Sequence, residues 1–260
     1  MAELIDTHAH LFYEHFESDL PEVIARARAA GVAAVVAIGT TAESSARCVE
    51  LAGRFEGVWA TAGVHPNEAL QARPDGRERV AALLAGPRVV GVGETGLDRH
   101  WKDTPFDVQE EWFAWHMELG RATGLPVVIH SRDCEADMLR VLRAAYDEHG
   151  PIKGVMHSFV GTAAAAEAYV AMGLYLSFAG MLTYKNAAEL RAVASTVPRD
   201  RLLVETDSPY LPPVPMRGKR NEPAYVRYTA EALAQAQGAS PEELAAVTTR
   251  NARALFGLAQ

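Results

Sequence analysis

The sequence predicts a single-domain α/β protein, one (β/α)₈ TIM barrel spanning residues 1–260. Eight short apolar runs alternate along the chain with longer segments of helical periodicity. This alternation indicates a parallel sheet with right-handed crossovers. A chain of 260 residues also fits one barrel without remainder. Eight repeats favour the closed barrel over the alternative, an open doubly wound sheet.

The expected strands are continuous apolar runs in which Val and Ile are prominent, which is typical of parallel strands buried on both faces. They lie at 4–5, 32–38, 58–62, 89–93, 126–129, 152–156, 174–178 and 202–204. No low-complexity tract or flexible linker interrupts the alternation. The runs therefore belong to one domain.

The segments between the strands have helical spacing and recognisable ends. Ser18-Asp19 followed by Glu22 begins the first helix, and Gly31 ends it. The helix expected at 107–123 is ended by Gly124 and Pro126. Further helices are expected at 42–54, 75–85, 134–147, 161–172, 186–196, 222–237 and 240–256.

Composition and charge limit the classes of function. The formal net charge of −8 argues against broad electrostatic binding to nucleic acid, although it leaves room for a local basic rim. Cys48 and Cys134 are too few for a disulfide framework. Neither a secretory signal nor an apolar run of the ~20 residues that a membrane span needs is found. We expect a cytoplasmic protein with no membrane attachment and no obligate protein partner.

Metal-binding side chains follow six of the eight predicted strands, at the edge where a (β/α)₈ enzyme carries its chemistry. In strand order they are His8 and His10, His65, Glu94, His130, His157, and Glu205 with Asp207. The carboxyl ends of parallel strands meet at one face of the barrel, so these side chains are expected to converge. The pattern predicts a metal centre there.

Each residue type suits a role in a site with two divalent ions. His8 and His10 are two residues apart on an extended segment, so both point the same way and can bind one ion. His130 and His157 offer imidazole nitrogens to either ion. Glu94 can bridge the ions with its two oxygens. We expect Glu94 and Asp207 to be catalytic, because Asp207 can also take a proton from an attacking water.

The remaining histidines and two short motifs are interpreted as structural. His15, His100, His116 and His149 lie away from strand ends, and packing in a helix explains His116. Residues 91–96 match the GxGxxG pattern of dinucleotide-binding folds, but an acid inside the turn would repel a pyrophosphate. We expect instead a strand that turns sharply to present Glu94. The proline-rich stretch 209–215 is expected to form an ordered loop beside the site.

Several motifs together resemble those of the TatD-type metal-dependent deoxyribonucleases, within the wider amidohydrolase superfamily. The resemblance extends over nearly the whole chain, and its C-terminal motif is long and specific. The matching stretches are 6–11 (DTHAHL), 63–66 (GVHP), 93–98 (GETGLD), 130–133 (HSRD), 157–159 (HSF), 205–211 (ETDSPYL), 217–218 (RG) and 221–223 (NEP).

The resemblance implies a binuclear hydrolase that cleaves DNA phosphodiester bonds from the 3′ end of single strands. It places metals at His8, His10, Glu94, His130, His157 and Asp207, with Mg²⁺, Mn²⁺ or Zn²⁺ as candidates. Glu94 takes the bridging place that a carboxylated lysine fills in many superfamily relatives. The chain departs slightly at 157–161, which read HSFVG where the family often has HCFSG. This difference is expected to affect loop packing more than chemistry.

Substrate contacts are expected on the loops around the metals. His65, Arg132, Tyr210 and Arg217 are the main candidates, with Tyr210 stacking on a base. Further candidates are Arg99, Trp101, Lys102, Lys219 and Arg220.

Three other functions stay open on the sequence alone. The same metal site would serve a hydrolase of small esters, lactones or amides, which the acidic charge and the absence of an extended basic stripe keep open. It would also serve ester cleavage on a misacylated transfer RNA, as by a D-aminoacyl-tRNA deacylase. A metal-binding scaffold without turnover is disfavoured, because Asp207 would then have no reason to lie among the histidines.

Overall fold

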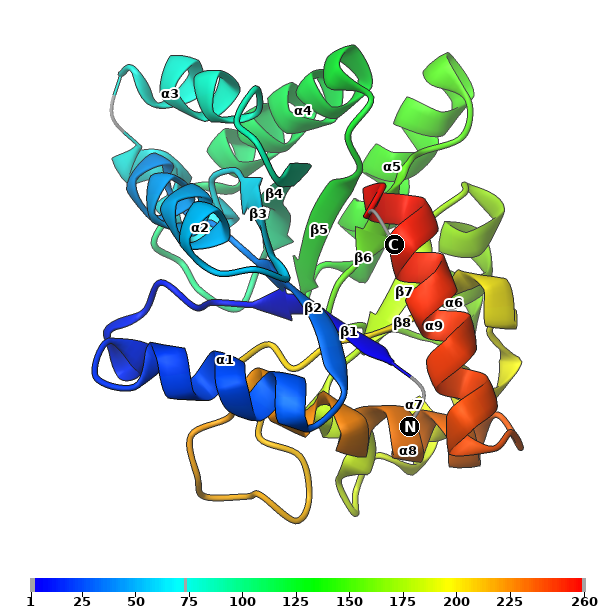
Figure 1. The fold of residues 1–260 in the computed structure, drawn as a ribbon. Coiled ribbons are helices and arrows are strands. Elements are labelled where there is room, and N and C mark those ends of the chain that lie inside the picture. The colour runs from blue at the N-terminus through cyan, green and yellow to red at the C-terminus, as the bar shows by residue number, and fades with distance from the viewer. Residues whose placement is uncertain (1–2, 73, 259–260) are drawn as a thin grey trace.

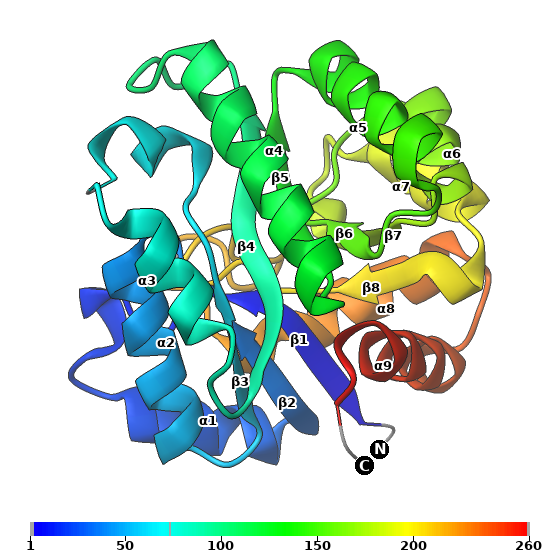
Figure 2. The same ribbon diagram turned by 90° about the horizontal axis from the view of Figure 1, so that it is seen from above.

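The computed structural model describes residues 3–72 and 74–258, and within them eight parallel strands form one sheet in the order β1 to β8. Helices surround the strands, which occupy the middle of the molecule (Figures 1 and 2). The strands are β1 Leu4–Ala9, β2 Val32–Ala37, β3 Val58–Ala62, β4 Val89–Asp98, β5 Val127–Arg132, β6 Gly154–Met156, β7 Tyr175–Phe178 and β8 Leu202–Val204. The predicted (β/α)₈ barrel is confirmed.

The barrel closes between β8 and β1 at the carboxyl ends of the strands. The Asp207 amide donates to the carbonyl of His8 over 2.9 Å, and the His10 amide donates to the carbonyl of Ser208 over 2.8 Å. One residue before His8 on β1, the Thr7 hydroxyl donates to the carbonyl of Val204 at the end of β8 over 3.0 Å. The hydrogen bonds that complete the barrel therefore also place Asp207 beside His8 and His10.

The helices begin and end where capping chemistry allows. Thr41 and Ser240 both form capping boxes, at the starts of α2 and α9, and Gly124 ends α4 in the left-handed conformation. The helices are α1 Leu20–Ala29, α2 Ala42–Arg54, α3 Gly76–Leu83, α4 Phe106–Thr123, α5 Glu135–His149, α6 Ala163–Ala171, α7 Ala188–Thr196, α8 Val226–Ala236 and α9 Pro241–Phe256.

Two hydrophobic clusters divide the core. The larger one packs the helices on the outside of the sheet. The smaller one contains strand residues such as Val90, Val128 and Leu203, together with Leu255 and Phe256 from the end of α9. Helix α9 lies beside β1 and β8 in both ribbon views (Figures 1 and 2). The end of α9 therefore packs its apolar side chains against the residues inside the barrel.

Several predicted elements have different bounds in the structure: β1 continues to Ala9 and β5 to Arg132. Strand β4 does not turn away at Glu94 but continues to Asp98, because Thr95 to Asp98 still pair with β5 after an irregularity that follows Val92. Gly96, at φ 140°, makes this possible: a Cβ there would lie 2.0 Å from the carbonyl oxygen of His130. The helix predicted at 222–237 begins as a short 3₁₀ turn, Pro223–Tyr225, and continues as α8.

Short 3₁₀ helices, which the sequence analysis did not predict, occupy several of the loops. They are Glu14–Phe16, Pro66–Gln71, Gly180–Thr183 and Arg199–Arg201. Across the described ranges 3–72 and 74–258, no helix combines the length and apolar character that crossing a membrane requires.

Candidate metal centre

The six predicted metal ligands come together at the carboxyl ends of the strands. His8 lies near the end of β1, Glu94 in β4 and His130 in β5, whereas His10, His157 and Asp207 lie on the segments that follow β1, β6 and β8. Four of the six are buried, and His130 and Asp207 keep only 15% and 14% of their side-chain surface exposed. The cluster therefore lies on the floor of a cleft.

Glu94 occupies the centre of this cluster with one oxygen toward each side. Its Oε1 lies 2.8 Å from His157 Nε2 and 3.1 Å from His130 Nδ1. Its Oε2 lies 3.3 Å from His8 Nε2 and 3.7 Å from His10 Nε2. The two carboxylate oxygens thus face two different pairs of histidines, which is the arrangement expected of a bridging ligand.

Asp207 completes the group on the His8 side. Its Oδ1 lies 3.3 Å from His10 Nε2 and 3.6 Å from His8 Nε2. One set of candidate ligand atoms, from His8, His10 and Asp207, lies within 4.8 Å of one another, and so does a second set from Glu94, His130 and His157. Three ligand atoms at such separations suit a divalent ion with open positions for water or substrate.

Two buried polar atoms in the cluster find no hydrogen-bond partner among the described residues of the protein itself, as expected of a site that binds a cation. Within the described part of the chain, Glu94 Oε2 and His8 Nδ1 are buried without a hydrogen-bond partner. A buried carboxylate oxygen left in this state is costly. A cation between Glu94 and the histidines would satisfy the carboxylate oxygen, so the donor set fits metal ions.

Partners behind the histidines fix which ring nitrogen faces the centre. Asp98 Oδ2 lies 2.9 Å from His130 Nε2, and Glu205 Oε1 lies 3.3 Å from His157 Nδ1. His10 Nδ1 lies 3.2 Å from the carbonyl of Ile38. Each contact holds a proton on the outer nitrogen, so that the inner nitrogen is free to bind a cation.

Asp98 was not predicted as a site residue, and Glu205 was named at its strand end without a role, although both lie in the quoted motifs. Their positions in the sequence could have indicated a role beside the metal ligands: Glu205 is two residues before Asp207, and Asp98 follows Glu94 by four on the same strand.

Asp6 is a further buried acid near the centre. It accepts hydrogen bonds from the amide and hydroxyl of Thr206 at 2.9 and 2.5 Å, and so joins β1 to β8. Burial raises the pKa of Asp6 to about 8.

The charges of the cluster favour an ionised Glu94 among histidines whose pKa values shift in opposite directions. Burial alone would raise the pKa of Glu94, but the facing His157 and His8 rings lower it well below its ordinary value. Burial lowers the pKa of His8, and it lowers the pKa of His65 to about 3. Contact with Glu94 outweighs burial at His157 and raises its pKa well above the ordinary value. Glu94 is therefore anionic and ready for a cation.

A cavity of about 610 Å³ lies over the cluster and contains three of the four main substrate candidates. His65 Nε2 lies 3.6 Å from Glu94 Oε1, while Arg132 and the half-exposed Tyr210 line the wall. Trp101 lines the same cavity, with the Arg132 guanidinium 5.8 Å from its ring centre.

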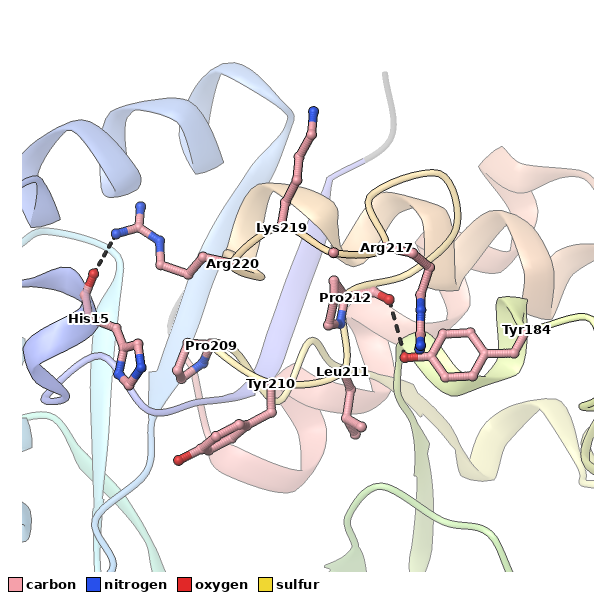
Figure 3. A pocket seen from close by; sticks show the side chains of 10 residues that line it. His15, Tyr184, Pro209, Tyr210, Leu211, Pro212, Arg217, Lys219 and Arg220 are labelled. Carbon is pink, nitrogen blue, oxygen red and sulfur yellow. Dashed lines mark hydrogen bonds between the residues drawn. The ribbon is translucent and has the colours of Figure 1, made fainter.

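Arg217 does not line this cavity. It lies in a neighbouring one, over the ring of Tyr184 (Figure 3). Two minor candidates for phosphate contacts prove to be engaged elsewhere. Arg220 pairs with Asp19, and Arg99 pairs with Asp137 at 2.7 Å.

The histidines interpreted as structural lie outside the cluster. His116 is fully buried on α4, where its Nε2 accepts a hydrogen bond from the Val64 amide over 3.1 Å. Its Nδ1 lies 2.7 Å from the carbonyl of Trp112. This agrees with the packing role expected from the sequence.

The comparisons with known proteins agree with the resemblance. The family model for TatD related DNase matches residues 5–257. The metal-dependent hydrolase YabD of Bacillus subtilis is 41% identical over 253 residues, covering 97% of this chain and 98% of the relative. The 3′–5′ ssDNA/RNA exonuclease TatD of Cronobacter sakazakii is 38% identical over 259 residues, covering 97% of each chain.

A solved structure matches equally well over its length. The crystal structure of YjjV, a TatD homologue from Escherichia coli K12, has a TM-score of 0.92 to this chain at 29% identity and covers 99% of both chains. The barrel, the cluster at its mouth and these relatives define a metal-dependent hydrolase. The chain belongs to the TatD family.

Proposed function

We propose that the protein is a deoxyribonuclease that removes nucleotides from the 3′ end of single-stranded DNA with the help of two divalent metal ions. The observation that carries the proposal is the position of Glu94, whose two oxygens face two separate histidine pairs. A site for one ion would need only one of these pairs. The name of the Cronobacter relative, a 3′–5′ ssDNA/RNA exonuclease, supports the polarity and the substrate class.

Two ions, when bound, supply an acidified water and neutralise charge on the phosphate. The side chains supply the rest. His8, His10 and Asp207 hold one side of the site, and His130 and His157 hold the other. Asp207 turns Oδ1 to the histidines. Its second oxygen can then take the proton of the attacking water.

Residues on the wall of the cavity would position the strand end. The pKa of His65 is lowered to about 3, so this histidine stays neutral and can donate a hydrogen bond to a phosphate oxygen. Arg132 brings a positive charge to the same wall, and the Tyr210 ring offers a face for a base. A cavity of about 610 Å³ has the size of a small-ligand site, which suits the end of a strand.

The net charge fits an enzyme that binds a strand end better than one that tracks along a duplex. A protein that neutralises many phosphates needs an extended basic surface. This chain has a formal net charge of −8. Only a few phosphates near the end would then be bound directly.

The test is digestion of single-stranded DNA labelled at its 5′ end, with added Mg²⁺, Mn²⁺ or Zn²⁺. A ladder that shortens stepwise from the 3′ end is expected, and Asp207→Asn should abolish it. Asp200→Asn, an exposed carboxylate on the turn before β8, is the matched control and should retain activity. Absence of cleavage with metal bound would reject the nuclease proposal and favour a hydrolase of small esters or lactones.

A further inference from the structure

A second cavity, of about 550 Å³, opens beside the metal cleft and shares two residues with it. Tyr210 and Leu211 line both cavities. The second cavity lies under the long loop between β8 and α8 and is closed on its far side by Tyr184 (Figure 3). A chain that leaves the metal cleft over Tyr210 would therefore enter this second cavity directly.

The second cavity carries positive charge that the protein does not neutralise. Among the described residues, no carboxylate lies within 4.0 Å of the cationic nitrogens of Arg217 or Lys219. Arg220 differs, because both of its terminal nitrogens lie 2.8 Å from Asp19. In Figure 3 the Lys219 side chain points away from Tyr184 and Tyr210, whereas Arg217 lies beside Tyr184. In a chain with an excess of acids, the unpaired Arg217 favours an anionic ligand.

Arg217 is oriented in a way that suits a phosphate. Its guanidinium carbon lies 4.3 Å from the centre of the Tyr184 ring, so the planar group lies over that ring (Figure 3). Tyr184 is itself fixed, since its hydroxyl donates to the carbonyl of Pro212 over 3.2 Å. Stacking occupies the face of the guanidinium and leaves its N–H edge free for a bidentate contact with phosphate oxygens.

The loop is held in shape before any ligand binds. Asn221 donates through Nδ2 to the carbonyl of Thr206 over 2.9 Å and to that of Tyr210 over 2.6 Å. Gly180 touches the same loop: a Cβ on it would lie 2.1 Å from the carbonyl oxygen of Leu211. Arg220 ties the loop to the start of α1 through Asp19. A preorganised cavity loses little entropy on binding, which favours a binding site over a merely solvated rim.

We propose that this second cavity binds the nucleotide on the 5′ side of the scissile bond, with Arg217 on its phosphate. The inference rests on the proposed nuclease function, since a 3′ exonuclease has the remaining strand on the 5′ side of the cut. It makes the preferred substrate a strand with at least one phosphodiester beyond the one that is cleaved. A dinucleotide without a 5′ phosphate still has a nucleoside on this side but lacks the phosphate that Arg217 would bind, and a small phosphodiester lacks both.

The first test compares kcat/KM for a single-stranded decamer with that for a dinucleotide, in the wild type and in Arg217→Ala. We expect the decamer-to-dinucleotide ratio to fall at least fivefold in Arg217→Ala. Arg250→Ala, an exposed arginine on α9, is the matched control and should keep the wild-type ratio. An unchanged ratio in Arg217→Ala would overturn the inference while leaving the nuclease function intact.

The second test measures binding without turnover. Fluorescence anisotropy of a labelled decamer gives its Kd with Asp207→Asn and with the double variant Asp207→Asn/Arg217→Ala over a range of salt concentrations. Loss of one phosphate contact should reduce the slope of log K against log salt by about 0.7. Equal slopes would contradict the inference. If the wild type binds the decamer but cleaves neither substrate, the nuclease proposal is rejected. The comparison of the two salt slopes then still decides whether Arg217 binds a phosphate.

Discussion

The two ends of the barrel have opposite chemistry. At the end where the strands begin, Leu255 and Phe256 of α9 pack against the apolar residues inside the barrel. At the other end, histidines and carboxylates converge on Glu94. One end is thus filled with hydrocarbon and the other keeps a cavity above a charged floor.

The same strands supply residues to both the apolar cluster and the metal centre. Val128 on β5 belongs to the apolar cluster and His130, two residues later, belongs to the metal centre. Val155 and His157 repeat this relation on and after β6. Alternation with a period of two keeps both members of each pair on the inner side of the barrel. Stability and chemistry are therefore separated along the barrel axis, and variants at either end can break or sharpen that separation.

The largest expected effect is on turnover at the charged end. Asp207→Asn keeps the size of the side chain but removes the proton acceptor, so kcat should fall by about 10²- to 10⁴-fold. The thermal midpoint should change little, because the barrel core is untouched. Single-turnover kinetics and thermal unfolding on the same preparation check both. Full activity in the variant would remove Asp207 from the mechanism.

The next effect is on stability at the apolar end. Phe256→Ala should lower the free energy of unfolding by about 3–5 kcal/mol, because it leaves a cavity in the inner cluster. The folded fraction should retain wild-type kcat/KM. Urea unfolding measures the first quantity, with the exposed Leu70→Ala as control, expected to change it by less than about 0.5 kcal/mol. A folded Phe256→Ala protein without activity would break the proposed separation.

A smaller effect is expected on metal affinity. In the wild type the Ser158 amide donates to Glu205 over 2.7 Å, and Glu205→Gln keeps an oxygen there. The variant weakens the contact of this side chain with His157 Nδ1, because it removes the carboxylate charge. Loss of such a partner should reduce metal affinity about 10- to 100-fold. Competition with a chelating dye measures this, and Glu231→Gln on the surface of α8 is the control. Wild-type affinity in Glu205→Gln would mean that His157 needs no support.

The last prediction concerns the pH dependence of stability. Burial lowers the pKa of His116 from 6.5 to about 3. As pH falls from about 6.5 to about 3, the unfolded chain binds a proton that the folded chain does not. The free energy of unfolding therefore decreases as the pH falls through this window. In His116→Gln the slope of unfolding free energy against pH in that window should be smaller by up to about 1.4 kcal/mol per unit. An identical slope, measured by urea unfolding, would show that His116 is protonated when folded.

Local sequence patterns predicted the strands and the strand-end ligands, because burial and parallel topology act on short segments. Partnerships between distant segments were harder to predict. Arg217 and Arg220 are three residues apart and look equivalent in the sequence, yet Arg220 is neutralised by Asp19 from the other end of the chain. The continuation of β4 beyond Glu94 likewise depends on pairing with β5.

Anomalous scattering from a crystal of the protein grown with Mn²⁺ tests most directly whether Glu94 lies between two metal ions. Two peaks roughly 3.5–4 Å apart are expected. One should lie among His8, His10 and Asp207 and the other beside His130 and His157, with Glu94 between them. A single peak, or peaks away from Glu94, would contradict it.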